Sequence, residues 1–216
     1  MNSNAIGIFG GTFDPFHNAH LSIARAFYKE LRLRYVRLIP TGHPYHRPQN
    51  QITPAYHRLA MAKLAIDNDA KLIVDDREIH RARASYTVET LEELRNELGW
   101  HNVFWLLIGS DSLANLSSWK DWQRLFDLTN LAVVWRPGFS KTALPSDIRR
   151  QWDQRYTRYF SKSTISGIIH TLSVQPIDLS ATMVRERLAR QQPIQNLVTP
   201  SVMHYIQEHG LYHGME

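Results

Sequence analysis

Short apolar runs alternate along this chain with segments whose apolar residues recur at helical spacing, and this alternation constrains the fold more than any other feature. Alternating strand and helix patterns are typical of βαβ units, which pair their strands in parallel through right-handed crossovers. The predicted strands are Ile6–Phe9, Val36–Ile39, Leu72–Val74, Val103–Ile108, Leu131–Trp135 and Ile168–Val174. The predicted helices are Ala19–Leu31, Ala55–Asp67, Thr87–Leu98, Ser118–Leu128, Thr182–Arg190 and Ser201–His209.

The pattern predicts one α/β domain over residues 1–216, a Rossmann-like, doubly wound parallel sheet, because 216 residues suit a single domain of this class. Residues 138–166 are the least patterned part, and we expect an excursion from the sheet there, not a second domain. Within it Ile148, Trp152, Tyr156 and Tyr159 have the spacing of one helix face. Residues 179–216 are expected to form a small C-terminal helical part.

The composition limits the possible classes of function. The chain has no cysteine, which excludes disulfides, thiolate metal sites and cysteine nucleophiles. Its N-terminus lacks a signal-peptide pattern, and its longest strongly apolar run, Val103–Ile108, is too short to cross a bilayer. The formal net charge of +5 suits polyanionic ligands such as nucleotides or pyrophosphate, whereas no Lys/Arg block indicates a nucleic-acid tail. We therefore expect a cytoplasmic protein with neither a membrane nor a nucleic acid as partner.

The segment GGTFDPFHNAH, residues 10–20, follows the first predicted strand, at the edge where doubly wound sheets bind ligands. We expect Gly10 and Gly11 to allow a sharp turn or the close approach of a ligand. A helix starting near Asn18 offers free amides and a positive dipole end to an anion. His17 and His20, three residues apart, can point the same way and donate to phosphate oxygens.

Other interpretations of this segment stay open from the residues alone. It is neither a dinucleotide fingerprint nor a P-loop, because G-x-G-x-x-G and Gly-Lys-Ser/Thr are missing. A single histidine at such a position is commonly a cap or a surface residue. A zinc site would need a third ligand, which His43, His46 or His57 could supply, and nothing fixes their geometry.

The same segment resembles the G-G-[ST]-F-D-P-x-H-x-G-H motif of the nucleotidylyltransferase superfamily, in its nicotinate mononucleotide adenylyltransferase branch. The chain has Ala19 where that motif has glycine. Four more segments resemble this branch in the same order and span nearly the whole chain, although Tyr45 replaces a proline in the first of them. They are HPYHR (His43–Arg47), SYTVETL (Ser85–Leu91), IGSDSLANLSSW (Ile108–Trp119) and LSATMVRERL (Leu179–Leu188).

The resemblance implies transfer of AMP from ATP to nicotinate mononucleotide, giving deamido-NAD and pyrophosphate in NAD biosynthesis. The acceptor's phosphate is already a nucleophile, so positioning and charge stabilisation suffice. The implied catalytic residues are His17, His20 and Arg185. The implied ATP-binding residues are Gly10, Gly11, Thr12, Phe13, Gly109, Asp111, Ser180 and Thr182. Mg²⁺ is expected to enter with ATP, mostly hydrated, and we assign it no protein ligand.

The resemblance also implies where the acceptor binds. Trp119 would offer an indole face to the cationic pyridinium ring, whereas Trp122 is expected to be a core residue. The amides near Tyr86 and Thr87 would receive the nicotinate carboxylate at a helix start. His46, Arg47 and Arg136 would approach the mononucleotide.

Three alternatives remain on the sequence alone. The chain could be another adenylyl- or cytidylyltransferase, with phosphopantetheine or nicotinamide mononucleotide as acceptor. It could be a non-catalytic nucleotide sensor, which would tolerate loss of the histidine pair. It could also be a nucleic-acid-binding module, whose affinity would fall steeply with salt.

Overall fold

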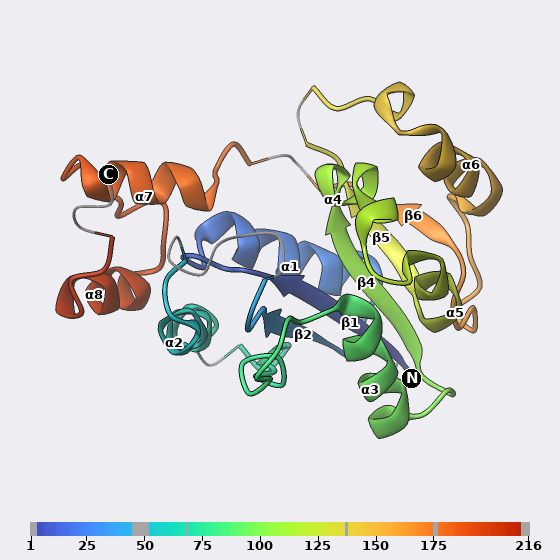
Figure 1. Cartoon of the computed structure of the whole chain (residues 1–216), viewed down its shortest axis with the longest axis horizontal. Helices are drawn as coiled ribbons and strands as arrows, with labels where there is room; N and C mark the ends of the chain where they lie inside the picture. The colour runs from blue at the N-terminus through green and yellow to red at the C-terminus, as the bar shows by residue number, and fades with distance from the viewer. Residues whose placement is uncertain (1–3, 45–51, 68, 137, 175–176, 213–216) are drawn as a thin grey trace. The chain divides into compact units, whose positions relative to one another are not determined.

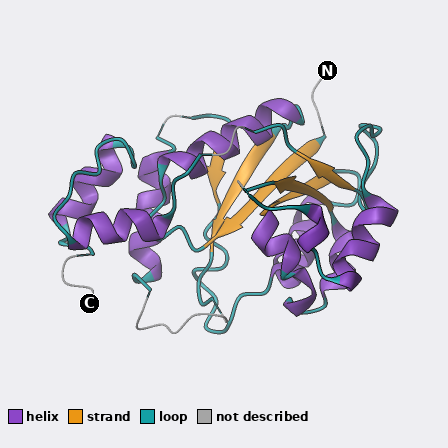
Figure 2. Cartoon of the chain, turned by 90° about the horizontal axis from the view of Figure 1, so that it is seen from above, coloured by secondary structure: helices purple, strands orange, loops and turns teal. Residues whose placement is uncertain are grey.

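The computed structural model describes residues 4–44, 52–67, 69–136, 138–174 and 177–212. Its six strands form one sheet in the order β3-β2-β1-β4-β5-β6 (Figures 1 and 2). The strands are β1 (Ala5–Gly11), β2 (Tyr35–Pro40), β3 (Leu72–Val74), β4 (Val103–Gly109), β5 (Asn130–Val134) and β6 (Ile169–Thr171). All six predicted strands are confirmed, and the last is shorter than predicted.

The central strands are buried along their length, which explains their continuous apolar runs. Every residue of β5 is buried, and in β4 only Gly109 is partly exposed. Strand β4 is parallel to β1 and to β5, pairing Val103 with Ala5 and Leu106 with Leu131. Both faces of a parallel sheet are buried under other elements, so its strands carry apolar residues at consecutive positions.

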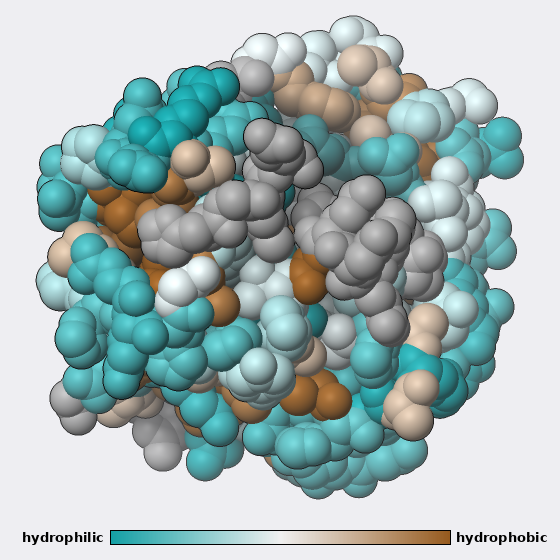
Figure 3. Space-filling model, turned by 60° about the vertical axis from the view of Figure 1, so that its left-hand side comes forward, coloured by the Kyte–Doolittle hydropathy of each residue, from teal (hydrophilic) through white to brown (hydrophobic). Residues whose placement is uncertain are grey.

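Helices connect these strands, as the alternating pattern predicts. The longer helices are α1 (Asn18–Glu30), α2 (Ala55–Ala65), α3 (Thr87–Leu98), α6 (Ser146–Arg155), α7 (Ala181–Ala189) and α8 (Pro200–Glu208). Five of them match predicted helices to within two residues at each end. The C-terminal helical part is confirmed as α7 and α8. On the face shown in Figure 3, hydrophilic residues predominate among the coloured atoms, as expected when the apolar residues are buried in a core.

The predicted helix Ser118–Leu128 is wrong as a single helix. The chain instead forms α4 (Ser110–Ala114), η2 (Leu116–Ser118), η3 (Trp122–Arg124) and α5 (Leu125–Leu128). Trp119 is extended, with φ −79° and ψ 144°, and Asp121 is left-handed, with φ 47°. Two non-helical residues so close together break the i→i+4 hydrogen-bond ladder, although the apolar spacing suggests one helix.

Residues 138–166 contain η4 (Lys141–Ala143) and α6, and no strand among the residues that are described there. Ile148 and Trp152 are buried on α6, in agreement with the proposed helix face. Tyr156 ends the helix in an extended conformation, and Tyr159 is 84% exposed. The helix face therefore has two members and not four.

The chain divides into two compact units. The first unit comprises Met1–Gly10, Ala26–Arg37 and Tyr86–Pro176, and the second comprises Gly11–Arg25, Leu38–Ser85 and Ile177–Glu216. The strand β1 and the helix α1 each pass from one unit into the other. The single domain expected over residues 1–216 stays a prediction. No helix within the described ranges is long and apolar enough to span a membrane.

Candidate active site

The glycine-histidine segment begins inside β1 and turns later than predicted. Gly10 and Gly11 belong to the strand, and neither has a positive φ. The left-handed residue is Phe13, with φ 51°. A Cβ atom on Gly11 would lie 2.8 Å from the Phe13 ring, so Gly11 is needed for close packing of this ring. The glycines therefore do not make the turn, and the close approach of a ligand to them stays a prediction.

His17 and His20 form a reciprocal cap at the start of α1. The carbonyl of His17 accepts the first helical hydrogen bond, from Leu21 N at 3.2 Å, which makes His17 the N-cap residue. Its Nδ1 accepts from His20 N at 3.4 Å, and Nδ1 of His20 accepts from His17 N at 3.2 Å. This is the pattern of a capping box, built here from two imidazoles.

The capping bonds determine where each ring carries its proton. A backbone N–H can only donate, so each Nδ1 must present a lone pair. In a neutral imidazole the proton then lies on Nε2, which becomes the donor. The two rings stack with their centroids 3.6 Å apart and their planes 15° apart. The pair thus serves both as a cap and as two parallel N–H donors.

Aromatic side chains support His20. The rings of Phe13 and Phe16 lie 5.0 Å and 5.2 Å from its ring, between centroids. Both phenylalanines are buried, at 3% and 1% exposure. The side chain of Phe13 is therefore part of the core, and only its backbone remains a candidate for ATP binding.

The start of α7 reaches the same segment from a distant part of the sequence. Ser180 caps α7 by accepting from Met183 N at 3.2 Å, as predicted. Nη1 of Arg185 donates to the carbonyl of Asp14 at 2.7 Å, and its Nη2 donates to Thr182 Oγ1 at 3.2 Å. The second unit therefore brings Ser180, Thr182 and Arg185 to the loop that leads into the histidine pair.

In the first unit, two predicted residues meet beyond the carboxyl ends of β4 and β5. Asp111 Oδ2 and Arg136 Nη1 form an ion pair of 2.9 Å. The backbone N of Arg136 also donates to Ser110 Oγ at 3.1 Å. Gly109 ends β4, and a Cβ atom there would meet nothing within 4 Å. These groups lie at the sheet edge where ligands of doubly wound folds bind.

The start of α3 has no side-chain capping bond from its N-cap residue. Tyr86 is its N-cap residue, in an extended conformation and without a side-chain capping bond. Lys120 Nζ lies 4.8 Å above the Tyr86 ring and 2.8 Å from Glu89 Oε1. The hydrogen bond with Glu89 raises the pKa of Lys120. Thr87, the first residue of the helix, carries one of the amides that can face an anion.

The remaining predicted residues are placed as follows. Trp119 is partly exposed and follows η2, and its stacking role stays a prediction. His46 and Arg47 lie outside the described residues. Among the residues that the structure describes, no three His, Asp or Glu side chains gather as a metal site would require.

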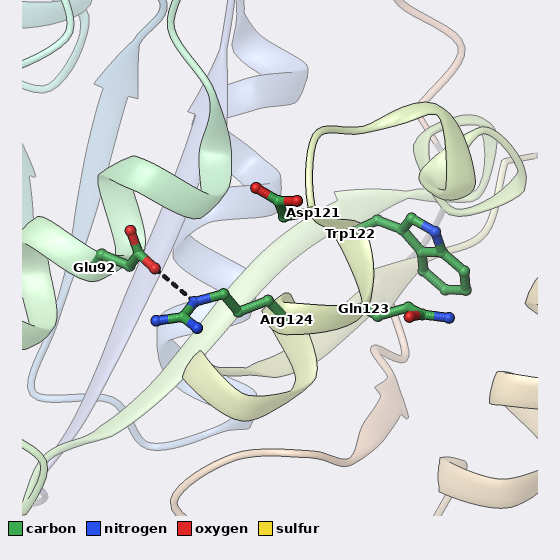
Figure 4. A pocket seen from close by; sticks show the side chains of 5 residues that line it. All are labelled: Glu92, Asp121, Trp122, Gln123 and Arg124. Atoms are coloured by element: carbon green, nitrogen blue, oxygen red, sulfur yellow. Dashed lines mark hydrogen bonds and ion pairs between the residues drawn. The ribbon is translucent and has the colours of Figure 1, made fainter.

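An open depression of about 700 Å³ is lined by other residues than these. Its lining is Glu92, Asp121, Trp122, Gln123 and Arg124, with an ion pair between Glu92 and Arg124 (Figure 4). Trp122 is partly exposed at this depression, so the expectation that it is a core residue is wrong. The buried tryptophans are Trp105 and Trp152, at 2% and 4% exposure.

The sequence reasoning missed two buried residues of the second unit. Asp14, 2% exposed, belongs to the GGTFDPFHNAH motif. The Asp-Pro pair in that motif was the sequence signal that could have pointed to it. Arg58, 1% exposed, lies in α2, and its sequence context does not distinguish it from the other arginines of the chain.

Comparison with known proteins identifies the family. Residues 8–187 match the cytidylyltransferase-like family. A probable nicotinate-nucleotide adenylyltransferase of Chromobacterium violaceum is 56% identical over 98% of this chain and 100% of its own length. Another probable nicotinate-nucleotide adenylyltransferase, from Laribacter hongkongensis, is 43% identical over 96% of this chain and 94% of its own length.

Solved structures share the fold. The nicotinic acid mononucleotide adenylyltransferase of Plasmodium falciparum in complex with NaAD has a TM-score of 0.74 at 20% identity, covering 96% of this chain and 97% of its own. The same protein in complex with APC has a TM-score of 0.71 at 19% identity, covering 96% of each chain. The chain therefore belongs to the cytidylyltransferase-like family and, within it, to the nicotinate-nucleotide adenylyltransferases.

Proposed function

We propose that this chain transfers the adenylyl group of ATP to nicotinate mononucleotide, forming deamido-NAD and releasing pyrophosphate. The histidine cap of α1 carries this proposal, because it presents two Nε2–H donors beside the start of α7. Relatives that share up to 56% of the sequence carry the name of this activity.

In the proposed reaction a phosphate oxygen of the mononucleotide attacks the α-phosphorus of ATP. A new O–P bond forms, the bond between the α-phosphorus and the bridging oxygen breaks, and its electron pair leaves with pyrophosphate. The attacking oxygen is already anionic, so no general base is required. His17 and His20 would donate to the oxygens around the α-phosphorus, where negative charge increases in the transition state.

Arg185, Thr182 and the amides at the start of α7 would hold the leaving pyrophosphate. The guanidinium is anchored by the Asp14 carbonyl through Nη1, so its position is set before ATP binds. A cation fixed in this way stabilises developing charge without having to reorganise. Gly10, Gly11, Thr12 and the backbone of Phe13 would line the nucleotide side.

The other predicted residues would supply further contacts. Gly109 and Asp111 would face the ATP ribose, and Arg136 would approach a phosphate of the acceptor. Tyr86, Thr87 and Trp119 would bind the nicotinate ring and its carboxylate, with His46 and Arg47 as additional acceptor contacts. The ion pair of Asp111 and Arg136 supports this assignment, because it fixes both groups at the end of their strands.

We propose Mg²⁺ as the ion that enters with ATP. It would neutralise phosphate charge, and it commonly keeps several waters and few protein ligands. The cytoplasmic location and the absence of a nucleic-acid partner stay predictions from the sequence.

The experiment that tests the function is a pyrophosphate-release assay with saturating Mg-ATP and four acceptors. These are nicotinate mononucleotide, nicotinamide mononucleotide, phosphopantetheine and glycerol phosphate. We expect nicotinate mononucleotide to exceed nicotinamide mononucleotide in kcat/KM by roughly tenfold or more, about 1.4 kcal/mol. A carboxylate accepts at both oxygens, whereas an amide would turn its NH₂ towards one of the donors near Tyr86 and Thr87.

The other outcomes identify the alternatives. A preference for phosphopantetheine or glycerol phosphate would assign the chain to another branch of the superfamily. Equal use of the two mononucleotides would contradict the carboxylate-reading role of the α3 start. ATP binding without any pyrophosphate release would favour a nucleotide sensor.

A further inference from the structure

The side chain of Arg58, in α2, is buried and donates to three backbone carbonyls. Nε donates to Thr53 O at 2.9 Å, Nη1 to Thr12 O at 2.8 Å and Nη2 to Gly42 O at 3.0 Å. Arg58 is 1% exposed. A planar guanidinium can satisfy three separately placed acceptors at once, which a lysine ammonium on a flexible stem does less well.

The three carbonyls belong to three different loops of the second unit. Thr12 lies between β1 and the histidine cap, and Gly42 lies after β2, immediately before the segment that contains His46 and Arg47. Thr53 precedes α2. One side chain therefore ties the loop of the catalytic histidines to the start of the loop expected to approach the acceptor.

The Gly42 loop has little freedom to move. A Cβ atom on Gly42 would lie 1.9 Å from the carbonyl oxygen of Glu78, so only glycine fits there. Glu78 itself is buried, at 7% exposure. The Gly42 carbonyl is thus held between the Glu78 backbone on one side and the Arg58 guanidinium on the other.

Asp14 supplies the charge that a buried guanidinium requires. Its Oδ2 accepts from Thr53 N at 3.2 Å, and its Oδ1 accepts from Tyr212 OH at 2.7 Å. Burial lowers the pKa of Arg58, and the charges of Asp14 and Glu78 act in the opposite direction. Burial, and then Asp14, raise the pKa of Tyr212, which keeps its hydroxyl proton for this bond.

We propose that Arg58 is a positioning residue for adenylyl transfer, with Asp14 and Tyr212 as its supports. Arg58 holds the Thr12 and Gly42 carbonyls and so sets the distance between the histidine loop and the acceptor loop. Asp14 extends the same framework, because its own carbonyl accepts from Arg185. This inference rests on the function proposed above, and it adds a residue that does not itself contact substrate.

Arg95 provides a matched control in the first unit. It is 2% exposed, and its guanidinium donates to the carbonyls of Leu128 and Asn102 at 2.7–2.9 Å. Burial lowers its pKa to about 10. Asn102 and Leu128 precede β4 and β5, so Arg95 holds the amino ends of these strands, opposite the edge where ligands bind.

The test compares Arg58→Lys with Arg95→Lys in the full chain. Both variants should melt at a lower temperature than the wild type, because each leaves buried carbonyls without a donor. Only Arg58→Lys should also lower kcat, by roughly tenfold to a hundredfold, and raise KM for nicotinate mononucleotide, since small misplacements of reacting groups are costly. Rates are measured well below both melting temperatures.

Two results would overturn the proposal: a folded Arg58→Lys enzyme with wild-type kcat and KM, or an equal loss of activity in Arg95→Lys. If Arg58→Lys does not fold, Tyr212→Phe decides, because it removes the hydroxyl that donates to Asp14 and keeps the ring. A several-fold lower kcat would support the framework, and an unchanged kcat would overturn it. If the wild-type protein releases no pyrophosphate, the proposed function itself is contradicted. If the wild type is active, the kinetics of the variants bear on the role of Arg58 alone.

Discussion

Two pairs of histidines in the second unit differ in how their rings are arranged and bound. His17 and His20 stack face to face, and each Nδ1 accepts from a backbone N–H. His57 and His209 meet edge to face at 5.2 Å, and Nδ1 of His57 lies 2.9 Å from Tyr205 OH. A hydroxyl can donate or accept, so this partner leaves the tautomer of His57 open.

The difference lies in what each pair is bound to. Backbone amides hold the first pair in one tautomer, which directs both Nε2–H groups away from the cap. In the second pair His57 is buried and lies beside the Tyr205 hydroxyl, whereas His209 is exposed and its Nδ1 lies 3.1 Å from the Tyr205 carbonyl. Close approach of two imidazoles is therefore not enough to indicate a phosphate site, whereas a pair of imidazoles capping a helix offers a positive helix end as well.

The largest effect is expected at His20. His20→Ala removes one donor to the transition state and should lower kcat roughly 10²–10³-fold, about 2.7–4 kcal/mol. It also removes half of the cap, so the melting temperature should fall. His20→Glu restores a cap acceptor but no donor, so it should recover stability and not kcat. The measurements are steady-state kinetics and thermal melts of both variants.

His209→Ala is the matched control from the second pair, and it should keep the wild-type kcat. The comparison fails if folded His20→Ala retains near-normal kcat, or if His209→Ala loses as much activity as His20→Ala.

Arg185 should show the next largest effect. Arg185→Met deletes the cation anchored on Asp14 and should lower kcat/KM roughly tenfold to a hundredfold, since hydrogen bonds to charged groups contribute about 1.5–3 kcal/mol. Arg187→Met is the control, because Arg187 lies on the same helix and donates at 3.4 Å to Pro193 O. Similar kinetics of the two variants would show that Arg185 has no special role.

A smaller effect, confined to stability, is expected at the second pair. Tyr205→Phe removes the hydrogen bond to His57 and should lower the free energy of unfolding by about 0.5–1.5 kcal/mol. Its kcat should stay unchanged, because the contact joins α2 and α8 alone. Urea titration of this variant measures the free energy of unfolding, and steady-state kinetics measure kcat. A fall in kcat larger than twofold would contradict a purely structural role for Tyr205.

The smallest effect concerns pH. Burial, and then the charge of His209, lower the pKa of His57 from 6.5. The unfolded chain then binds more protons than the folded protein below about pH 6.5, so stability is highest above that pH and falls as the solution is acidified. His57→Phe should flatten this fall in melts between pH 7.5 and 5.5. An unchanged slope would assign the acid sensitivity to other groups.

Much of the fold follows from local sequence patterns. The six strands were predictable because buried parallel strands need consecutive apolar residues. The start of α1 near Asn18 and the Ser180 cap of α7 were predictable because helix ends depend on neighbouring residues. The predicted helix over Ser118–Leu128 failed because left-handed Asp121 interrupts it, and apolar spacing carries no information about a single φ.

The sequence by itself determined which residues are predicted to carry the chemistry, because the order and spacing of GGTFDPFHNAH, SYTVETL and LSATMVRERL are properties of the chain. Only the tertiary structure decided how His17 and His20 are bonded and that Arg185 meets Asp14, which lies 171 residues away. It also decided the role of Arg58, whose three acceptors are carbonyls. Every residue type has a backbone carbonyl, so no side-chain pattern in the sequence can reveal which carbonyls a buried arginine will hold.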